Sequence, residues 1–222
     1  MSINLSEKSR QLGDSDLLSN RTLSIPQLVS AHNELLWAIV GLLLTIGGTL
    51  VRAFVVNMPW EWADQGIQVY ELKVSCQIGA VLLVGCLGGK NAGALSQIAY
   101  IVMGLTGLSV FFDGGGIEYL NKPSFGYLLG FIPGAWLCGY LAFKSKARLE
   151  SLAFSCLSGL LTIHFCGLAY LIGLQFFHSP NNGVMGFFNS VWQYSISLLP
   201  GQMIIICAVS LIAFILRQIM FY

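Results

Sequence analysis

Long apolar runs that contain almost no charge constrain this chain more than any other feature. A helix crosses a bilayer when about 20 mainly apolar residues, each rising about 1.5 Å, span a hydrocarbon core about 30 Å thick. Six segments approach or meet this requirement: Leu35–Val56, Val74–Gly88, Gly93–Phe112, Phe125–Phe143, Ser151–Phe176 and Gly201–Ile219. Residues 186–199 are also apolar but are broken by Asn189 and Gln193, and they predict an interfacial segment before the last span. We therefore expect an all-α membrane protein with six transmembrane helices.

The distribution of charge supports this class and predicts an orientation. Only 9% of the 222 residues are charged, whereas about a quarter are charged in soluble domains. With six spans both termini lie on one side of the membrane, and eight Lys and Arg residues fall on that side: Lys8, Arg10, Arg21, Lys90, Lys144, Lys146, Arg148 and Arg217. Only Arg52, Lys73 and Lys122 fall on the other side. Because short cytoplasmic loops are enriched in Lys and Arg, both termini are predicted to be cytoplasmic, in a multi-pass protein of the plasma membrane.

The chain divides by composition into two parts. Residues 1–30 are polar, mix both signs of charge and lack the apolar core of a secretory signal, so we expect a disordered cytoplasmic tail. Residues 31–222 are expected to form a single six-helix transmembrane domain.

Polar residues inside the predicted spans mark where a ligand could bind. Gln77, Gln97, His164 and Gln202 are costly in lipid and are expected to face the interior of the helix bundle. Each could serve a helix–helix hydrogen bond or a ligand. Gln77 and Gln202 lie near the outer ends of their spans, beneath outer loops that are longer and richer in polar residues than the inner ones. These positions favour a site for a polar ligand that opens to the outside.

Motifs for catalysis and for ATP binding are missing from the sequence. The run Val84–Asn91 resembles a P-loop, but Val84 stands where Gly is required and Asn91 where Ser or Thr would bind magnesium. Ser158 and His164 lie six residues apart on one helix and so face away from each other. The six cysteines show no metal-ligand spacing and are interpreted as small buried hydrophobes. We expect a protein that is not an enzyme and has no cofactor, so that any ATPase is another chain.

Several motifs, in order along the chain, resemble the BioY family. Val74–Gln77 reads Val-Ser-Cys-Gln, which is similar to the family's Thr-x-Gln, and Gly93–Ser96 reads Gly-Ala-Leu-Ser. Gly107–Phe111 and the glycines 114–116 are similar to its Gly-Leu-Pro-Val-Phe and glycine loop. Pro123–Phe131 is similar to its Pro-Thr-Gly-Gly-Tyr-Leu-x-Gly-Phe. The resemblance covers roughly residues 74–205.

This resemblance implies a fold, a ligand and partners. BioY proteins are six-helix S components of energy-coupling-factor (ECF) vitamin transporters, and they bind biotin near the outer face of the membrane. They work with a transmembrane coupling subunit and two ATPase subunits. The expected ligand-binding residues are Gln77, Phe111, Gly115, Gly126, Tyr127, His164, Gln202 and Lys73.

One motif departs from the family pattern and leaves the ligand open. Where the family has Pro-Gly-Asp-x-x-Lys, this chain has Pro200-Gly201-Gln202-Met203-Ile204-Ile205. Gln202 can still bond a ureido ring, but Ile205 cannot pair with a carboxylate. We expect Lys73 or Lys122 to supply the missing charge. Alternatives are an S-component-like transporter for another small carboxylate or amphiphile, or a non-transport assembly subunit of the membrane.

Overall fold

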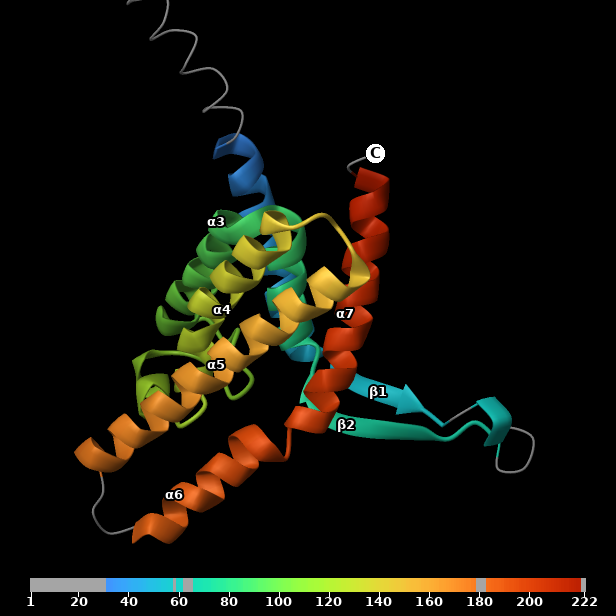
Figure 1. The fold of residues 1–222 in the computed structure, drawn as a ribbon. Helices are drawn as coiled ribbons and strands as arrows, with labels where there is room; N and C mark the ends of the chain where they lie inside the picture. Colours follow the sequence, from blue (N-terminus) through green and yellow to red (C-terminus); the bar gives the residue numbers. More distant parts are fainter. Residues whose placement is uncertain (1–30, 58, 62–65, 179–182, 221–222) are drawn as a thin grey trace, which may run out of the picture. The chain divides into compact units, whose positions relative to one another are not determined.

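The computed structural model describes residues 31–57, 59–61, 66–178 and 183–220. Contacts divide the chain into residues 1–36 and 37–222, and of the first unit the described residues 31–36 are helical. Residues 1–30, where a disordered tail is predicted, lie outside the described part. The elements that follow the helix Ala31–Leu50 are given in order: β1 Arg52–Val56, η1 Pro59–Glu61, β2 Val69–Ser75, α3 Gln77–Leu105, η2 Ile117–Asn121, α4 Phe125–Lys144, α5 Leu149–His178, α6 Gly183–Val191, the π-helical turn η4 Trp192–Ile196, and α7 Leu199–Met220 (Figure 1).

A two-stranded sheet departs from the all-α prediction, so the fold is mostly helical. Strands β1 and β2 pair antiparallel, with Phe54 opposite Glu71, and the Arg52 guanidinium lies 2.6 Å from the Glu71 carboxylate. The first helix ends at Leu50 and not at Val56 as predicted. Both strands are rich in β-branched and aromatic residues, which suit a pleated sheet but also occur in apolar helices. Hydrophobicity alone therefore did not distinguish a strand from the end of a transmembrane helix.

Helix α3 consists of two helical arms, because the chain folds back on itself at Gly89. Gly89 adopts φ 85° and ψ −178°, a conformation that glycine reaches without steric cost. Gln77 and Tyr100 would be roughly 35 Å apart in a straight helix. Instead the Gln77 amide nitrogen lies 2.9 Å from the Tyr100 hydroxyl. The two arms of α3 therefore run antiparallel, and they correspond to the second and third predicted spans. The second span was predicted to begin three residues before Gln77, and the third to end seven residues after Leu105.

Within the described part of the chain, five helices are long and apolar enough to cross a membrane: Ala31–Leu50, Gln77–Leu105, Phe125–Lys144, Leu149–Phe176 and Gly186–Met220. This number treats the two arms of α3 as one helix. The last of these begins within α6 and includes η4, and both elements correspond to the predicted interfacial segment. Helix α6 lies at a clear angle to α7 (Figure 1). The predicted positions of the fourth, fifth and sixth spans agree with α4, α5 and α7.

Glycines let the central helices approach one another closely. A Cβ atom at Gly85 of α3 would lie 2.8 Å from the carbonyl oxygen of Ala135 in α4. A Cβ atom at Gly130 of α4 would lie 2.9 Å from the carbonyl oxygen of Ile163 in α5. Small residues at helix contacts are typical of membrane bundles, where packing and not the exclusion of water drives association. This packing fixes the relative positions of the helix ends that surround the cavity described below.

Candidate ligand-binding site

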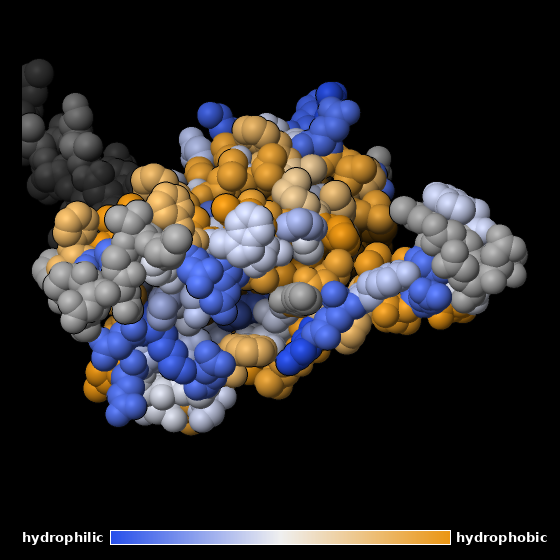
Figure 2. Space-filling model, turned by 90° about the horizontal axis from the view of Figure 1, so that it is seen from below, coloured by the Kyte–Doolittle hydropathy of each residue, from blue (hydrophilic) through white to orange (hydrophobic). Residues whose placement is uncertain are grey.

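A cavity of about 230 Å³ lies where α3, α4 and α7 begin and where β2 ends. Its lining is mostly apolar and aromatic with a few polar side chains: Val74, Ser75, Gln77, Ile78, Phe112, Tyr119, Ser124, Tyr127, Leu128, Phe131, Tyr194, Leu198 and Gln202. Hydrophilic residues gather around a hollow on this face of the molecule, and hydrophobic residues flank them (Figure 2). Such a lining is typical of small-molecule sites, where a few polar groups orient a ligand inside an apolar wall.

Gln77, the first residue of α3, offers the cavity a hydrogen-bond acceptor. Its amide nitrogen donates to the Tyr100 hydroxyl at 2.9 Å, and Tyr100 in turn donates to the Val110 carbonyl oxygen at 2.9 Å. These bonds fix the orientation of the Gln77 amide. The hydrogen bond that the described residues make to the Gln77 side chain uses its nitrogen and not its oxygen Oε1, and Gln77 lines the cavity. The oxygen is therefore available to an N–H group of a ligand.

Gln202, in the first turn of α7, offers the opposite chemistry. Its Oε1 lies 2.7 Å from Nε2 of His164, which is buried on α5. An amide oxygen only accepts hydrogen bonds, so Nε2 of His164 carries the proton and Nδ1 of the neutral ring accepts. The Ser195 hydroxyl lies 3.2 Å from Nδ1 and donates a hydrogen bond to it. The same hydroxyl accepts a hydrogen bond from the Tyr127 hydroxyl at 2.6 Å. The hydrogen bond that the described residues make to the Gln202 side chain uses its oxygen, so the amide N–H groups are available to a ligand carbonyl.

The two glutamines form a complementary pair across α3 and α7. Gln77 presents an acceptor, and Gln202 presents a donor, into the same cavity. A cyclic urea or amide carries a carbonyl oxygen beside N–H groups and can use both. A ligand that fills the cavity but leaves one of these amide groups without a partner loses about 1–3 kcal/mol for that group, so a ligand that satisfies both glutamines is favoured.

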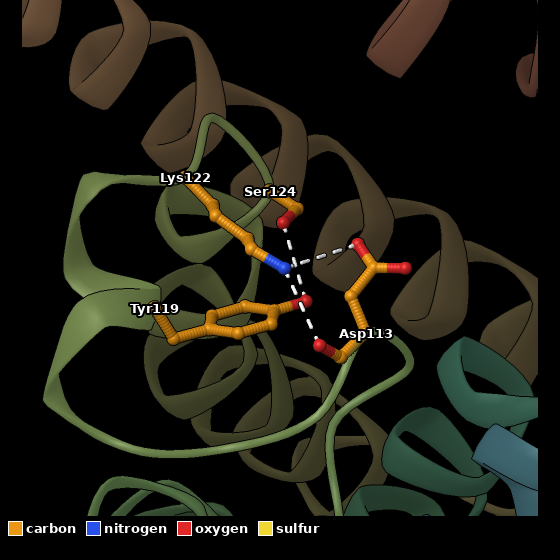
Figure 3. A network of polar contacts seen from close by, with 4 residues as sticks. All are labelled: Asp113, Tyr119, Lys122 and Ser124. Atoms are coloured by element: carbon orange, nitrogen blue, oxygen red, sulfur yellow. Dashed lines mark hydrogen bonds and ion pairs between the residues drawn. The ribbon is translucent and has the colours of Figure 1, made fainter.

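A second polar group lies at the edge of the cavity, in the segment that leads into α4 (Figure 3). The Ser124 hydroxyl donates to the Tyr119 hydroxyl at 3.3 Å, and both residues line the cavity. The Lys122 ammonium lies 4.8 Å from the centre of the Tyr119 ring, 3.3 Å from the Asp113 carbonyl oxygen and 3.7 Å from the Asp113 carboxylate. Burial raises the pKa of the Tyr119 hydroxyl, so this residue stays neutral while Lys122 contributes a positive charge.

The structure brings four of the predicted site residues together. Gln77, Tyr127 and Gln202 line the cavity, and His164 lies directly behind Gln202. Phe111 does not line the cavity: its ring packs against Tyr100 and Tyr119 at centroid distances of 5.4 and 4.6 Å. Phe111 therefore supports the wall, and its neighbour Phe112 reaches the cavity.

The remaining predicted residues have other positions. A Cβ atom at Gly126 would collide with the Tyr170 side chain, and one at Gly115 would collide with the Leu108 carbonyl oxygen, so both glycines permit close packing. The side chain of Lys73 lies outside the described part. Ile205, which replaces the family's lysine, is buried and packs against Gly79, where a Cβ atom would lie 2.8 Å from it.

Sequence reasoning missed several residues of the site. Ser75 and Ser124 each lie within two residues of the start of a long helix, which is a usable signal for a group at the end of a span. Tyr194 and Ser195 lie in η4, and no local pattern assigned them to a ligand site. Their place beside Tyr127 depends on how η4 packs against α4 and α5.

The model of the BioY family matches residues 26–221. The chain belongs to the BioY family. Its membership makes it a multi-pass membrane protein of a family of transporters.

Curated relatives and a solved structure extend this result. The probable biotin transporter BioY of Lysinibacillus sphaericus is 41% identical over 96 residues, which cover 43% of this chain and 49% of the relative. The biotin transporter BioY of Thermotoga maritima is 35% identical over 134 residues, or 58% of this chain and 75% of the relative. An uncharacterized 21.2 kDa protein of Cyanophora paradoxa is 28% identical over 190 residues, covering 84% and 95%. The crystal structure of the S-component for biotin from an ECF-type ABC transporter has the same fold, with a TM-score of 0.63 and 20% identity over 88% of this chain and 94% of that one.

Proposed function

We propose that this BioY-family chain is the high-affinity biotin-binding S component of an ECF-type uptake system. The observation that supports it most is the pairing of the Gln77 acceptor with the Gln202 donor inside an apolar cavity, in the fold of a biotin S component. The biotin transporters among its relatives support the same ligand.

The positions of the polar groups favour one orientation of biotin in the cavity. Its ureido ring lies between the two glutamines, where its N–H donates to Gln77 and its carbonyl accepts from Gln202. Its valeryl chain runs along the aromatic wall toward Tyr119 and Ser124. The carboxylate then reaches the edge of the cavity near Lys122, which supplies the positive charge that Ile205 cannot. Lys73 remains a second proposed source of this charge.

The chain is proposed to cross the membrane six times, with both termini in the cytoplasm. The antiparallel arms of α3 support this number, because the turn at Gly89 returns the chain to the side from which it came. The cavity then faces outward, and the Gly89 turn and the basic residues 144–148 face the cytoplasm. Single cysteines placed at Gln68 and Lys146, with the exposed Cys207 changed to Ser, should react with an impermeant thiol reagent from outside and from inside, respectively. Reaction of both from the same side would refute this topology.

Uptake is proposed to need partners. The sequence carries no ATP-binding motif, so the purified chain should bind biotin and release it slowly without net transport. A transmembrane coupling subunit and two ATPase subunits would supply the energy.

Thermal unfolding of the purified full-length chain tests the proposal. Biotin at 100 times its dissociation constant should stabilise the folded state by about 2.7 kcal/mol. This raises the midpoint of unfolding by roughly 5–10 °C for a chain of this size. Absence of any shift, together with absence of biotin binding in equilibrium dialysis, would refute the proposal.

One observation favours a second candidate, a transporter of the same fold for another small carboxylate or amphiphile. Among the described side chains that line the cavity, none is charged, and Ile205 packs in the protein core. A thermal-shift screen of small carboxylates and amphiphiles beside biotin separates the two candidates. A non-transport assembly subunit would need no cavity, so ligand binding of either kind argues against it.

A further inference from the structure

Three cysteines from different helices meet inside the bundle, away from the ligand cavity. Cys86 of α3, Cys138 of α4 and Cys156 of α5 are each fully buried. The Cys86 sulfur lies 3.6 Å from that of Cys138 and 3.5 Å from that of Cys156, and all three sulfurs lie within 4.8 Å of one another. Cys86 is nine residues beyond Gln77, roughly 13 Å farther along the first arm of α3. The cluster is therefore near the Gly89 turn and takes no part in the ligand site.

The spacing of the three sulfurs suits a metal ion. A point at the centre of a triangle with these sides lies roughly 2.0–2.4 Å from each sulfur, a range that includes the usual metal–thiolate bond length of about 2.3 Å. Close packing keeps the sulfurs in place: a Cβ atom at Gly159 would lie 3.0 Å from the Cys138 Cβ, and one at Gly85 would lie 3.4 Å from it. The triangle is thus formed by backbone positions that have little room to move.

A buried positive charge accompanies the thiols. Arg217 of α7 is only 7% exposed, and its guanidinium interacts electrostatically with Cys86 and Cys138. It is held by a 2.7 Å hydrogen bond to the Ala142 carbonyl oxygen and by the Phe143 ring, whose centre is 4.0 Å away. An adjacent guanidinium stabilises the negative charge that thiolates carry when they bind a metal.

We propose that Cys86, Cys138 and Cys156 form a trigonal binding site for one thiophilic metal ion, with Cu(I) as the fitting ion. Cu⁺ displaces the protons of two thiols, which pass to water, and the third sulfur binds as a thiol. The cluster then carries one negative charge, which the Arg217 guanidinium offsets. Soft sulfur ligands select Cu(I), whereas structural zinc sites almost always have four ligands. The described His, Cys, Asp and Glu residues add no fourth ligand to this group.

Anaerobic titration of the reduced, purified full-length chain with Cu(I), in competition with a chromophoric Cu(I) chelator, tests the proposal. One Cu(I) should bind per chain, and X-ray absorption should give three sulfur neighbours. Cys138→Ala should lower the affinity at least 100-fold. Cys207→Ala and Cys166→Ala are the matched controls, because these thiols lie outside the cluster, and both should bind like the unmodified chain.

Four outcomes would overturn the proposal: no stoichiometric binding, binding that survives Cys138→Ala, binding that Cys207→Ala abolishes, or a spectrum with fewer than three sulfur neighbours. If Cys138→Ala does not fold, the spectrum of the unmodified chain decides by itself. Biotin binding is measured separately and does not depend on this result.

Discussion

Nε2 of His164 lies 2.7 Å from Oε1 of Gln202, and this contact decides which end of the glutamine amide faces the cavity. Because the histidine holds the amide oxygen, the amide nitrogen is left for a ligand. The histidine is itself oriented by Ser195 and, through it, by Tyr127. A donor for a ligand carbonyl thus depends on four residues from three helices and the η4 turn, and the first two predictions follow from this part of the site.

Gln202→Leu should weaken biotin binding about tenfold or more. The substitution removes the donor and leaves the ureido carbonyl buried without a partner, which corresponds to about 1.4 kcal/mol or more. Isothermal titration of the purified chain measures the loss. Gln218→Leu is the matched control, because Gln218 is exposed on the same helix, and it should leave the affinity unchanged.

His164→Phe should weaken binding and also lower stability. Phenylalanine can keep the edge-to-face contact with the Tyr127 ring, whose centre is 5.7 Å away, but it cannot bond Gln202 or Ser195. Loss of two buried hydrogen bonds should lower the midpoint of thermal unfolding by about 3–8 °C without ligand. His32→Phe, at an exposed position, is the control. An unchanged midpoint and affinity would show that His164 does not position Gln202.

Lys122→Gln should lower the affinity for biotin but not the affinity for its uncharged amide. Removing the ammonium should weaken biotin binding about two- to fivefold, since an exposed ion pair is worth under about 1 kcal/mol. Biotin amide has no carboxylate, so its affinity should not change. Lys146→Gln, in the loop between α4 and α5, is the control. Equal losses for both ligands would assign Lys122 a structural role and leave Lys73 as the proposed cation.

Gly89→Ala should destabilise the protein by about 1–2 kcal/mol, because an alanine at φ 85° is strained. Gly47→Ala is the matched control: it lies inside a helix, and an added Cβ atom would meet nothing within 4 Å. That variant should be as stable as the unmodified chain or slightly more stable. Thermal unfolding in detergent measures both, and a Gly89→Ala chain with unaltered stability would contradict the strain at this turn.

The bounds of the helices show which features local sequence patterns predict and which they do not. The start of α4 at Phe125 and the course of α5 and α7 were predicted correctly, because a run of apolar residues reports directly on contact with lipid. Residues 52–56 were assigned to the first span but form β1, because the partner that makes them a strand, β2, is supplied by residues 69–75. Gln77 and Gln202 could be proposed as ligand-binding because a polar residue near the end of an apolar run is conspicuous. Ser195 and Tyr194 were not, since nothing near them in sequence points to a ligand site.

The sequence by itself determined that this is a membrane protein. Runs of apolar residues with almost no charge are stable in a bilayer, however the helices pack against one another. Motif order also predicted the family, because those motifs are local strings of residues. Only the tertiary structure decided that Gln77 contacts Tyr100 across the Gly89 turn and that His164 orients the Gln202 amide. It also decided that the sulfurs of three cysteines far apart in sequence lie within 4.8 Å of one another. These contacts join residues 23, 38 and up to 70 positions apart, and such distances are set by helix packing rather than by any local preference.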